Sequence, residues 1–83
     1  MMQPLILIYD IQHDGTRTKI ADTCLDYGLD RVQYSSFIGR LSRNRAEELM
    51  QDIETILGDK SGNIQLIPIA EKDWKSRLEI NHA

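Results

Sequence analysis

Five consecutive apolar residues, Leu5-Ile6-Leu7-Ile8-Tyr9, stand near the start of the chain and are followed by Asp10. A strand with one solvated face alternates apolar and polar residues, whereas an uninterrupted apolar run is typical of a strand covered on both faces. A chain of 83 residues has room for about one core and one small sheet. We therefore expect a single domain over residues 1–83, with a central strand that needs cover on two sides.

Two segments carry the three-to-four spacing of apolar residues that predicts an amphipathic helix. The first follows a polar turn at residues 11–15, can be capped by Asp14 or Thr16, and stops at Gly28. Its apolar face consists of Ile20, Ala21, Cys24 and Leu25. The second helix starts at a predicted capping box and runs as far as Gly58. The box is formed by Asn44 and Glu47, and the apolar face by Ala46, Leu49, Met50, Ile53, Ile56 and Leu57.

Three further segments are predicted to be extended. They are Arg31 to Tyr34, Phe37 to Leu41 and Asn63 to Ala70, with a bend or bulge at Ser35-Ser36. Pro68 cannot donate a ladder hydrogen bond, so it indicates an edge strand or a strand end. The alternation in residues 77–80 permits a short fifth strand, provided that it pairs with something.

The predicted element order, βαββαβ, is that of the ferredoxin-like α+β fold, in which two helices cover one face of a small antiparallel sheet. The apolar first strand implies that the other face is covered as well, and the chain is too short to cover it. A second copy is the simplest candidate, because small domains without disulfides often gain stability by association. We expect a homodimer packed sheet to sheet, in which the tail, residues 71–83, pairs with the partner subunit or with another protein.

Several functional classes are disfavoured. The apolar run is too short to span a bilayer and has no leader-like flank, so we expect a cytoplasmic protein without membrane contact. Cys24 is the only cysteine, which excludes an intrachain disulfide and a cysteine-rich zinc site and is best explained as a small buried side chain. The chain also lacks a glycine-rich phosphate loop, a serine nucleophile elbow, a His-Glu-x-x-His motif and an RNP-type aromatic motif.

One stretch is rich in arginine and free of acidic residues, although the formal net charge of the chain is −3. Residues 31–46 contain Arg31, Arg40, Arg43 and Arg45. Guanidinium groups suit phosphate oxygens, and the interleaved Tyr34 and Phe37 can either stack on bases or fill the core. The stretch predicts a nucleic-acid-binding surface, with a merely solubilising charged face as the alternative.

Asp10 is the first candidate for chemistry. Aspartate is common where strands break, so a turn-forming or capping role is one explanation. In a dimer packed through the first strand, Asp10 of each subunit could face its symmetry mate, and paired carboxylates suit a hard divalent cation that acts on a phosphodiester. His13 and Asp14 extend the pattern to D-x-x-H-D, which is explained either by additional metal ligands or by a solvated, helix-capping turn.

Several short motifs resemble the second CRISPR-associated protein family, whose members are often described as endoribonucleases. The motifs are LILIYDI at residues 5–11, an arginine-bearing turn and helix, Tyr27-Gly28-Leu29, and RVQYSSF at residues 31–37. At the level of motifs the resemblance spans roughly residues 5–41, and the remainder agrees in length and element order.

The resemblance implies a ferredoxin-like homodimer that joins the CRISPR integrase, the first CRISPR-associated protein, in capturing and inserting spacer DNA. It also implies metal-dependent endonuclease activity on RNA or DNA. Its implied site consists of a catalytic, Mg²⁺-binding Asp10, the recurrent basic residues Arg17 and Arg31, and the motif residues Tyr9, Ser36 and Phe37.

Three functions therefore remain open at this point. The first is a nucleic-acid-binding adaptation subunit that bridges DNA without catalysis. The second is a magnesium-dependent phosphodiesterase built around Asp10 at a dimer axis. The third, a regulatory dimer that senses a small molecule, lacks support from any ligand-binding motif.

Overall fold

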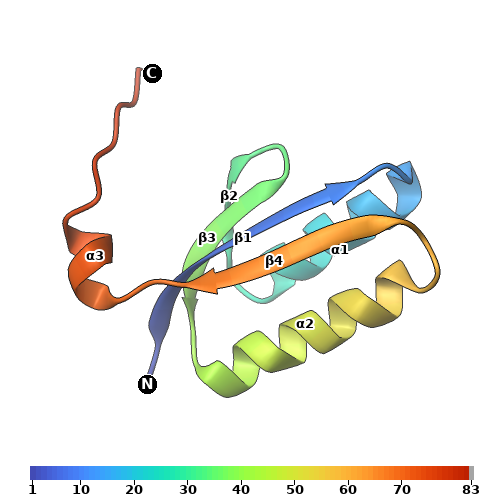
Figure 1. The fold of residues 1–83 in the computed structure, drawn as a ribbon, viewed down its shortest axis with the longest axis horizontal. Helices are drawn as coiled ribbons and strands as arrows, with labels where there is room; N and C mark the ends of the chain where they lie inside the picture. The colour runs from blue at the N-terminus through green and yellow to red at the C-terminus, as the bar shows by residue number, and fades with distance from the viewer. Residues whose placement is uncertain (83) are drawn as a thin grey trace.

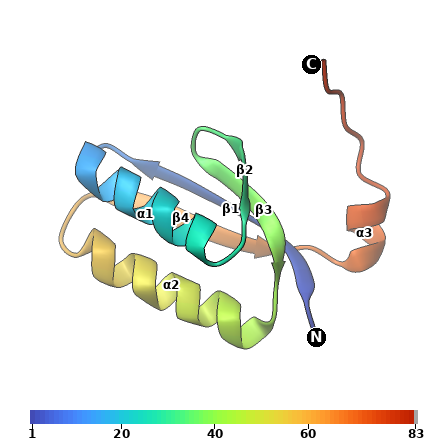
Figure 2. The ribbon, with the colours of Figure 1, turned by 180° about the vertical axis from the view of Figure 1, so that it is seen from behind.

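The computed structural model describes residues 1–82 as four strands and three helices. In chain order these are β1 (Gln3–Ile11), α1 (Asp14–Asp26), β2 (Asp30–Gln33), β3 (Ser36–Leu41), α2 (Arg43–Leu57), β4 (Gly62–Pro68) and α3 (Glu71–Lys75). All strand pairs are antiparallel, and the sheet order is β2-β3-β1-β4. Helices α1 and α2 lie together on one side of the sheet (Figures 1 and 2). The predicted ferredoxin-like α+β fold is confirmed.

The core lies between the sheet and these two helices. Strand β1 contributes Leu5, Leu7, Tyr9 and Ile11, which alternate along the strand and are all at most 5% exposed. The helices contribute Ile20, Ala21, Cys24, Ala46, Leu49 and Ile53, and Phe37 of β3 is fully buried among them. Cys24 is buried, as predicted from its apolar neighbours.

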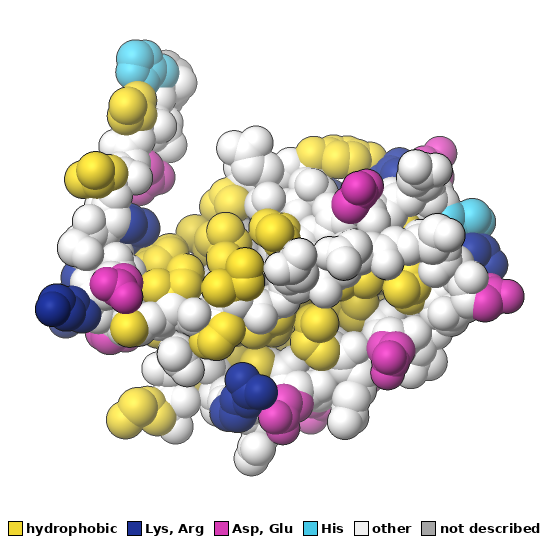
Figure 3. Space-filling model, viewed as in Figure 1, with side chains coloured by type: hydrophobic (Ala, Val, Ile, Leu, Met, Phe, Trp, Pro, Cys, Tyr) yellow, Lys and Arg dark blue, Asp and Glu magenta, His cyan; other side chains and the backbone are white. Residues whose placement is uncertain are grey.

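The opposite face of the sheet has no helix over it and is nevertheless apolar. Ile6 and Ile8 of β1 point to this face and are half-buried. In the strand register Ile6 lies between Ile38 of β3 and Ile67 of β4, and Ile67 is 42% exposed. Figure 3 shows hydrophobic side chains gathered across this side of the molecule. The apolar residues of β1 thus point to both faces of the sheet, and the protomer covers only one of these faces, with α1 and α2.

The first helix differs from expectation at its cap and on one face. His13 is the N-cap of α1, and its Nδ1 accepts the backbone N–H of Thr16 at 3.1 Å; the expected cap at Asp14 or Thr16 is wrong. Leu25, expected on the buried face, is 49% exposed because α1 turns it away from the sheet. Gly28 does adopt the left-handed conformation predicted for a helix stop, with φ of 88°.

The second helix begins two residues before the predicted cap. Ser42 is its N-cap, and its hydroxyl accepts the backbone N–H of Arg45 at 3.2 Å. The predicted Asn44/Glu47 capping box is therefore wrong, because a serine two residues earlier caps the free backbone donors of the first turn. The helix ends before Gly58, as expected.

The strands lie close to their predicted places. Strands β2 and β3 each begin one residue earlier than expected, and the irregularity falls between Arg31 and Gln33 as a register shift, followed by a turn at Tyr34 and Ser35. Pro68 is the last residue of β4, and β4 is an edge strand. Both explanations offered for this proline are therefore correct.

The tail differs most from expectation. The short helix α3 follows β4, and residues 77–82 form neither helix nor strand. Leu78 is 99% exposed and Ile80 is 88% exposed, and the segment extends away from the body of the protomer (Figures 1 and 3). The fifth strand is thus absent from the described residues of one protomer, in which residues 77–82 pair with no strand. Residues 1–82 also contain no helix long and apolar enough to cross a membrane.

Candidate active site at the end of the central strand

Asp10 is the penultimate residue of β1 and lies opposite Asn63 of β4. Its side chain is exposed and shares the uncovered sheet face with Ile6 and Ile8. The strand continues through Ile11 and α1 is capped by His13. Neither a strand-breaking nor a capping role therefore explains Asp10, which leaves a carboxylate at the edge of an apolar surface.

His13 and Asp14, the two residues considered as further ligands beside Asp10, have local partners instead. His13 uses Nδ1 to cap α1, and Asp14 forms an ion pair with Arg17 across the first turn of that helix. Within residues 1–82, no three His, Cys, Asp or Glu side chains come together as a metal site. Asp10 is therefore not part of a three-ligand metal site within the described residues of one protomer.

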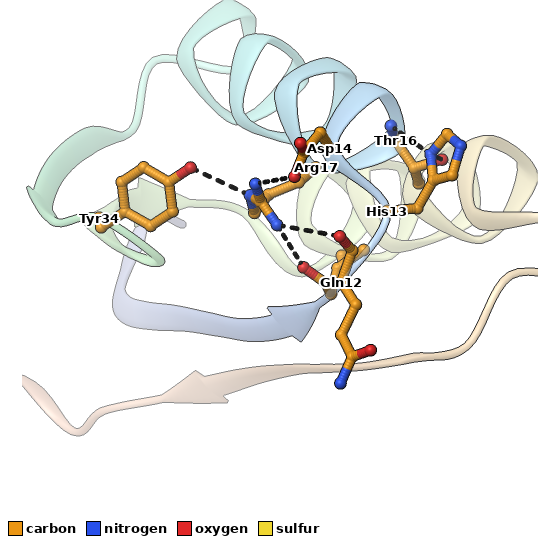
Figure 4. A network of polar contacts seen from close by, with 7 residues as sticks. Gln12, His13, Asp14, Thr16, Arg17 and Tyr34 are labelled. Carbon is orange, nitrogen blue, oxygen red and sulfur yellow. Dashed lines mark hydrogen bonds and ion pairs between the residues drawn. The ribbon is translucent and has the colours of Figure 1, made fainter.

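Arg17 fastens the loop that follows Asp10 (Figure 4). Its Nη1 donates to the carbonyl oxygen of Ile11 at 2.8 Å and to that of Gln12 at 3.3 Å. Its Nε donates to the hydroxyl of Tyr34 at 3.1 Å, and Nη2 pairs with Asp14. The hydrogen bonds to Asp14 and to Tyr34 raise the pKa of the Arg17 guanidinium. The predicted nucleic-acid contact of Arg17 stays a prediction, while its structural role is to hold the end of β1 against α1.

Arg31 joins the β2–β3 hairpin to the same end of β1. Its Nε and Nη2 donate to the carbonyl oxygen of Tyr34 at 3.1 and 2.8 Å, and Nη2 also reaches the hydroxyl of Tyr9 at 3.4 Å. The guanidinium carbon lies 5.3 Å from the ring centre of Phe37, which stacks on Tyr9 at 6.1 Å. Ser36 begins β3 opposite Ile8. Tyr9 and Phe37 therefore hold Arg31 on the helix-covered side of the sheet, whereas Asp10 points to the uncovered face.

The other three candidate arginines, Arg40, Arg43 and Arg45, lie at the far end of the sheet. Arg40 pairs in register with Pro4, six residues before Asp10 along β1, a separation of roughly 20 Å at about 3.3 Å per residue. The acid-free stretch of sequence therefore folds into two separate groups of arginines and not into one basic patch.

Each arginine of this far group has a carboxylate partner. Arg40 makes a two-pronged pair with Glu71 of α3, at 2.6 and 2.7 Å, which lowers the pKa of Glu71. In α2, Arg43 pairs with Glu47 at 3.0 Å and Arg45 pairs with Glu48. Of the five candidate arginines, Arg31 is the one without an ion pair to the residues that the structure describes. The surface is consequently less basic than the sequence of residues 31–46 suggests.

Glu71 was not predicted as a site residue, and Tyr34 was predicted only as an aromatic residue that either stacks on bases or fills the core; its 67% exposure excludes the core. Tyr34 lies at the hairpin tip between Arg17 and Arg31, and the only sequence signal for it was an aromatic residue within the arginine-rich stretch. Glu71 forms an ion pair with Arg40, although it lies 31 residues later in the sequence. No local pattern reveals a partner at that separation.

The chain was compared with known proteins. The profile of the family described as CRISPR associated protein Cas2 matches residues 2–77. The chain is 43% identical over 72 residues to the CRISPR-associated endoribonuclease Cas2 2 of Chloroflexus aurantiacus, covering 87% of this chain and 85% of that protein.

Solved structures agree with this match. The hypothetical protein TT1823 from Thermus thermophilus superposes with a TM-score of 0.82 at 25% identity, over 100% of this chain and 94% of that one. A chain of a partial Cas6-RT-Cas1–Cas2 complex superposes with a TM-score of 0.78 at 27% identity, over 94% of this chain and 84% of that one. With a profile match across most of its length and a relative of this similarity, the chain belongs to the Cas2 family.

Proposed function

We propose that this protein is a nucleic-acid-binding subunit of CRISPR adaptation that also cleaves phosphodiester bonds, with RNA as the first substrate to test. The observation that carries the proposal is the exposed Asp10 carboxylate at the rim of an apolar sheet face. At the same end of β1, on the other side of the sheet, Arg31 has no carboxylate partner among residues 1–82. The endoribonuclease name of the Chloroflexus relative supports the choice of substrate.

The proposed active unit is a homodimer joined through the uncovered sheet face. Ile6, Ile8, Ile38 and Ile67 would be buried between two copies, which removes apolar surface from water. This packing would bring the two Asp10 side chains toward the symmetry axis, because they share that face.

The tail supplies a second proposed contact between the copies. Strand β4 has a free edge, and hollows of about 370 and 390 Å³ lie between β4 and α2. The apolar lining of these hollows includes Met50, Leu57, Ile64 and Leu66. An extended segment at residues 77–82 of the partner would add a strand to this edge and bury Leu78 and Ile80.

The proposed cofactor is Mg²⁺, held by Asp10 of both copies. Magnesium is commonly bound by one or two carboxylates together with substrate phosphates, so two aspartates fit it although one protomer does not. When bound, the ion would polarise the phosphodiester or activate a water. The chain itself orients the site: Arg17 fixes the backbone after Asp10, and Arg31 offers positive charge to a substrate phosphate.

A second candidate function is a scaffold that bridges DNA for the integrase without cutting. It is favoured by the separation of the arginines into two groups at opposite ends of the sheet, because arginines at both ends can contact two segments of a duplex when phosphates replace their carboxylate partners. The solved chain from a complex containing Cas1 supports an integrase partner under both functions.

The two functions are distinguished by measuring cleavage of labelled single-stranded RNA and of duplex DNA in Mg²⁺. The proteins compared are wild type, Asp10→Asn and the control Asp59→Asn. Asp59 is an exposed carboxylate in the turn before β4. We expect Asp10→Asn to lower the cleavage rate by roughly 100-fold or more, as for loss of a group that stabilises developing charge, and Asp59→Asn to cleave normally.

Equal cutting by Asp10→Asn and wild type would identify the activity as a contaminant and end the nuclease proposal. Salt-sensitive binding of duplex DNA without cleavage by any variant would leave the scaffold as the function. Absence of both cleavage and binding would contradict both functions.

A further inference from the structure

We propose that Tyr34 is a stacking platform for one unpaired nucleobase, and that the protein therefore takes single-stranded nucleic acid at this point. The inference rests on the proposed nucleic-acid binding and extends it to a site outside the Asp10 carboxylate. It starts from an aromatic side chain that is both solvent-exposed and held in place.

Tyr34 is 67% exposed, whereas the other aromatic rings among the described residues are buried or half-buried. Its backbone is nevertheless fixed: the carbonyl oxygen accepts two hydrogen bonds from Arg31, and the next residue, Ser35, accepts from the backbone N–H of Tyr9 at 3.1 Å. A ring on a fixed backbone loses little freedom when a ligand binds, which favours its use as a contact.

Two guanidinium groups lie near this ring and still leave the residue 67% exposed. The guanidinium carbons of Arg17 and Arg31 each lie 5.4 Å from the ring centre. An arginine that covers an aromatic face in this protein lies nearer: Arg45 is 4.2 Å from the centre of Tyr27, and Arg77 is 4.0 Å from that of Trp74.

Arg17 in addition meets the hydroxyl edge of Tyr34, at 3.1 Å from Nε to Oη, and Figure 4 shows the hydroxyl pointing toward it. A positively charged edge and an exposed face are complementary to a base that stacks while its phosphates contact the arginines.

The ligand class follows from this geometry. Bases in a duplex are stacked on both faces and cannot stack on a protein ring without being extruded, whereas a single strand offers bases freely. Arg31 makes hydrogen bonds through Nε and Nη2, and its Nη1 has no partner among residues 1–82, so it can reach a phosphate. The site is beside Tyr9, at the end of β1 that carries Asp10, although the side chains of Tyr9 and Asp10 point to opposite faces of the sheet. A base bound on Tyr34 would fix the position of the strand at this end of β1.

The test is an equilibrium binding measurement on the full chain in EDTA, which prevents metal-dependent cleavage. The probes are a short single-stranded RNA and the matching DNA, each containing 2-aminopurine, and the corresponding duplexes. The variants are Tyr34→Leu, which removes the aromatic face, Tyr34→Phe, which keeps it, and Trp74→Leu as an aromatic control in α3.

Stacking on one ring is worth about 1–3 kcal/mol, or roughly a 5- to 150-fold change in affinity. We expect Tyr34→Leu to weaken single-strand binding by that factor and to remove the quenching of 2-aminopurine, while Tyr34→Phe, Trp74→Leu and all duplex affinities stay near wild type. A loss with either strand supports the site, and the strand that shows it identifies whether RNA or DNA is bound.

Unchanged single-strand affinity in Tyr34→Leu would overturn the stacking site alone. An equal loss for single strands and duplexes would also overturn it, because the ring would then act by supporting the arginines. Wild-type protein that binds no nucleic acid would contradict both this inference and the proposed function.

Discussion

Gly39 in β3 is the position where the backbone passes so close to a neighbour that a side chain does not fit. A Cβ atom there would lie 2.6 Å from Cδ2 and 3.3 Å from Cα of Leu29. Leu29 is 2% exposed and packed in the core, so it has little room to move. We expect Gly39→Ala to lower the free energy of unfolding by about 1–3 kcal/mol, the usual cost of overpacking, measured by urea denaturation.

Gly15 in the first turn of α1 is the matched control for this substitution. A Cβ at Gly15 would approach only the imidazole of His13, at 3.4 Å, which is ordinary contact. Replacing a glycine by alanine at such a position stabilises by about 0.4–1 kcal/mol, since the unfolded chain loses freedom. The steric argument is wrong if Gly39→Ala proves as stable as Gly15→Ala.

At the scale of elements, the sequence predicted what depends on local pattern and missed what depends on distant partners. The apolar pattern was sufficient to predict α2 and β1, and Gly28 was sufficient to predict where α1 ends. Asp10 was singled out because a carboxylate directly follows an apolar run. The pairing of Arg40 with Glu71 could not be predicted, because it depends on how β4 leads α3 back to the start of β1.

The docking of α3 should depend on pH through the Arg40–Glu71 pair. The pair lowers the pKa of Glu71, so its contribution is fully present above the usual glutamate pKa of about 4.3 and is lost as pH falls through the lowered value. Trp74, the only tryptophan, lies half-buried in α3. We expect its emission to shift to longer wavelength on acidification, and Glu71→Gln to show this shift already at neutral pH.

The control for α3 is Glu79→Gln, which removes a more distant contact, at 3.8 Å, between Glu79 and Arg77 in the tail. Its fluorescence should match wild type at neutral pH. A neutral-pH spectrum of Glu71→Gln that is identical to wild type would show that packing, and not this ion pair, holds α3 in place.

At the scale of the whole molecule, one protomer leaves two apolar features in water. The first is the uncovered sheet face, with Ile6 and Ile8 at its centre, and the second is the tail with Leu78 and Ile80. Because β1 is apolar on both faces, the fold is complete only when something covers the second one. The same chain provides a matching face, so a two-fold dimer satisfies both copies at once.

Dimerisation through this face is tested by light scattering on wild type, Ile8→Asp and the control Leu25→Asp, which places the same charge on an exposed position of α1. We expect wild type and Leu25→Asp to be dimers and Ile8→Asp to be a folded monomer, because a carboxylate on this face is solvated in the monomer and desolvated in the dimer. Circular dichroism separates dissociation from unfolding.

Deletion of residues 77–83 should weaken the dimer without abolishing it, since the sheet face remains. A monomeric wild type, or a dimer that survives Ile8→Asp, would place the interface elsewhere and remove the basis for pairing the two Asp10 carboxylates.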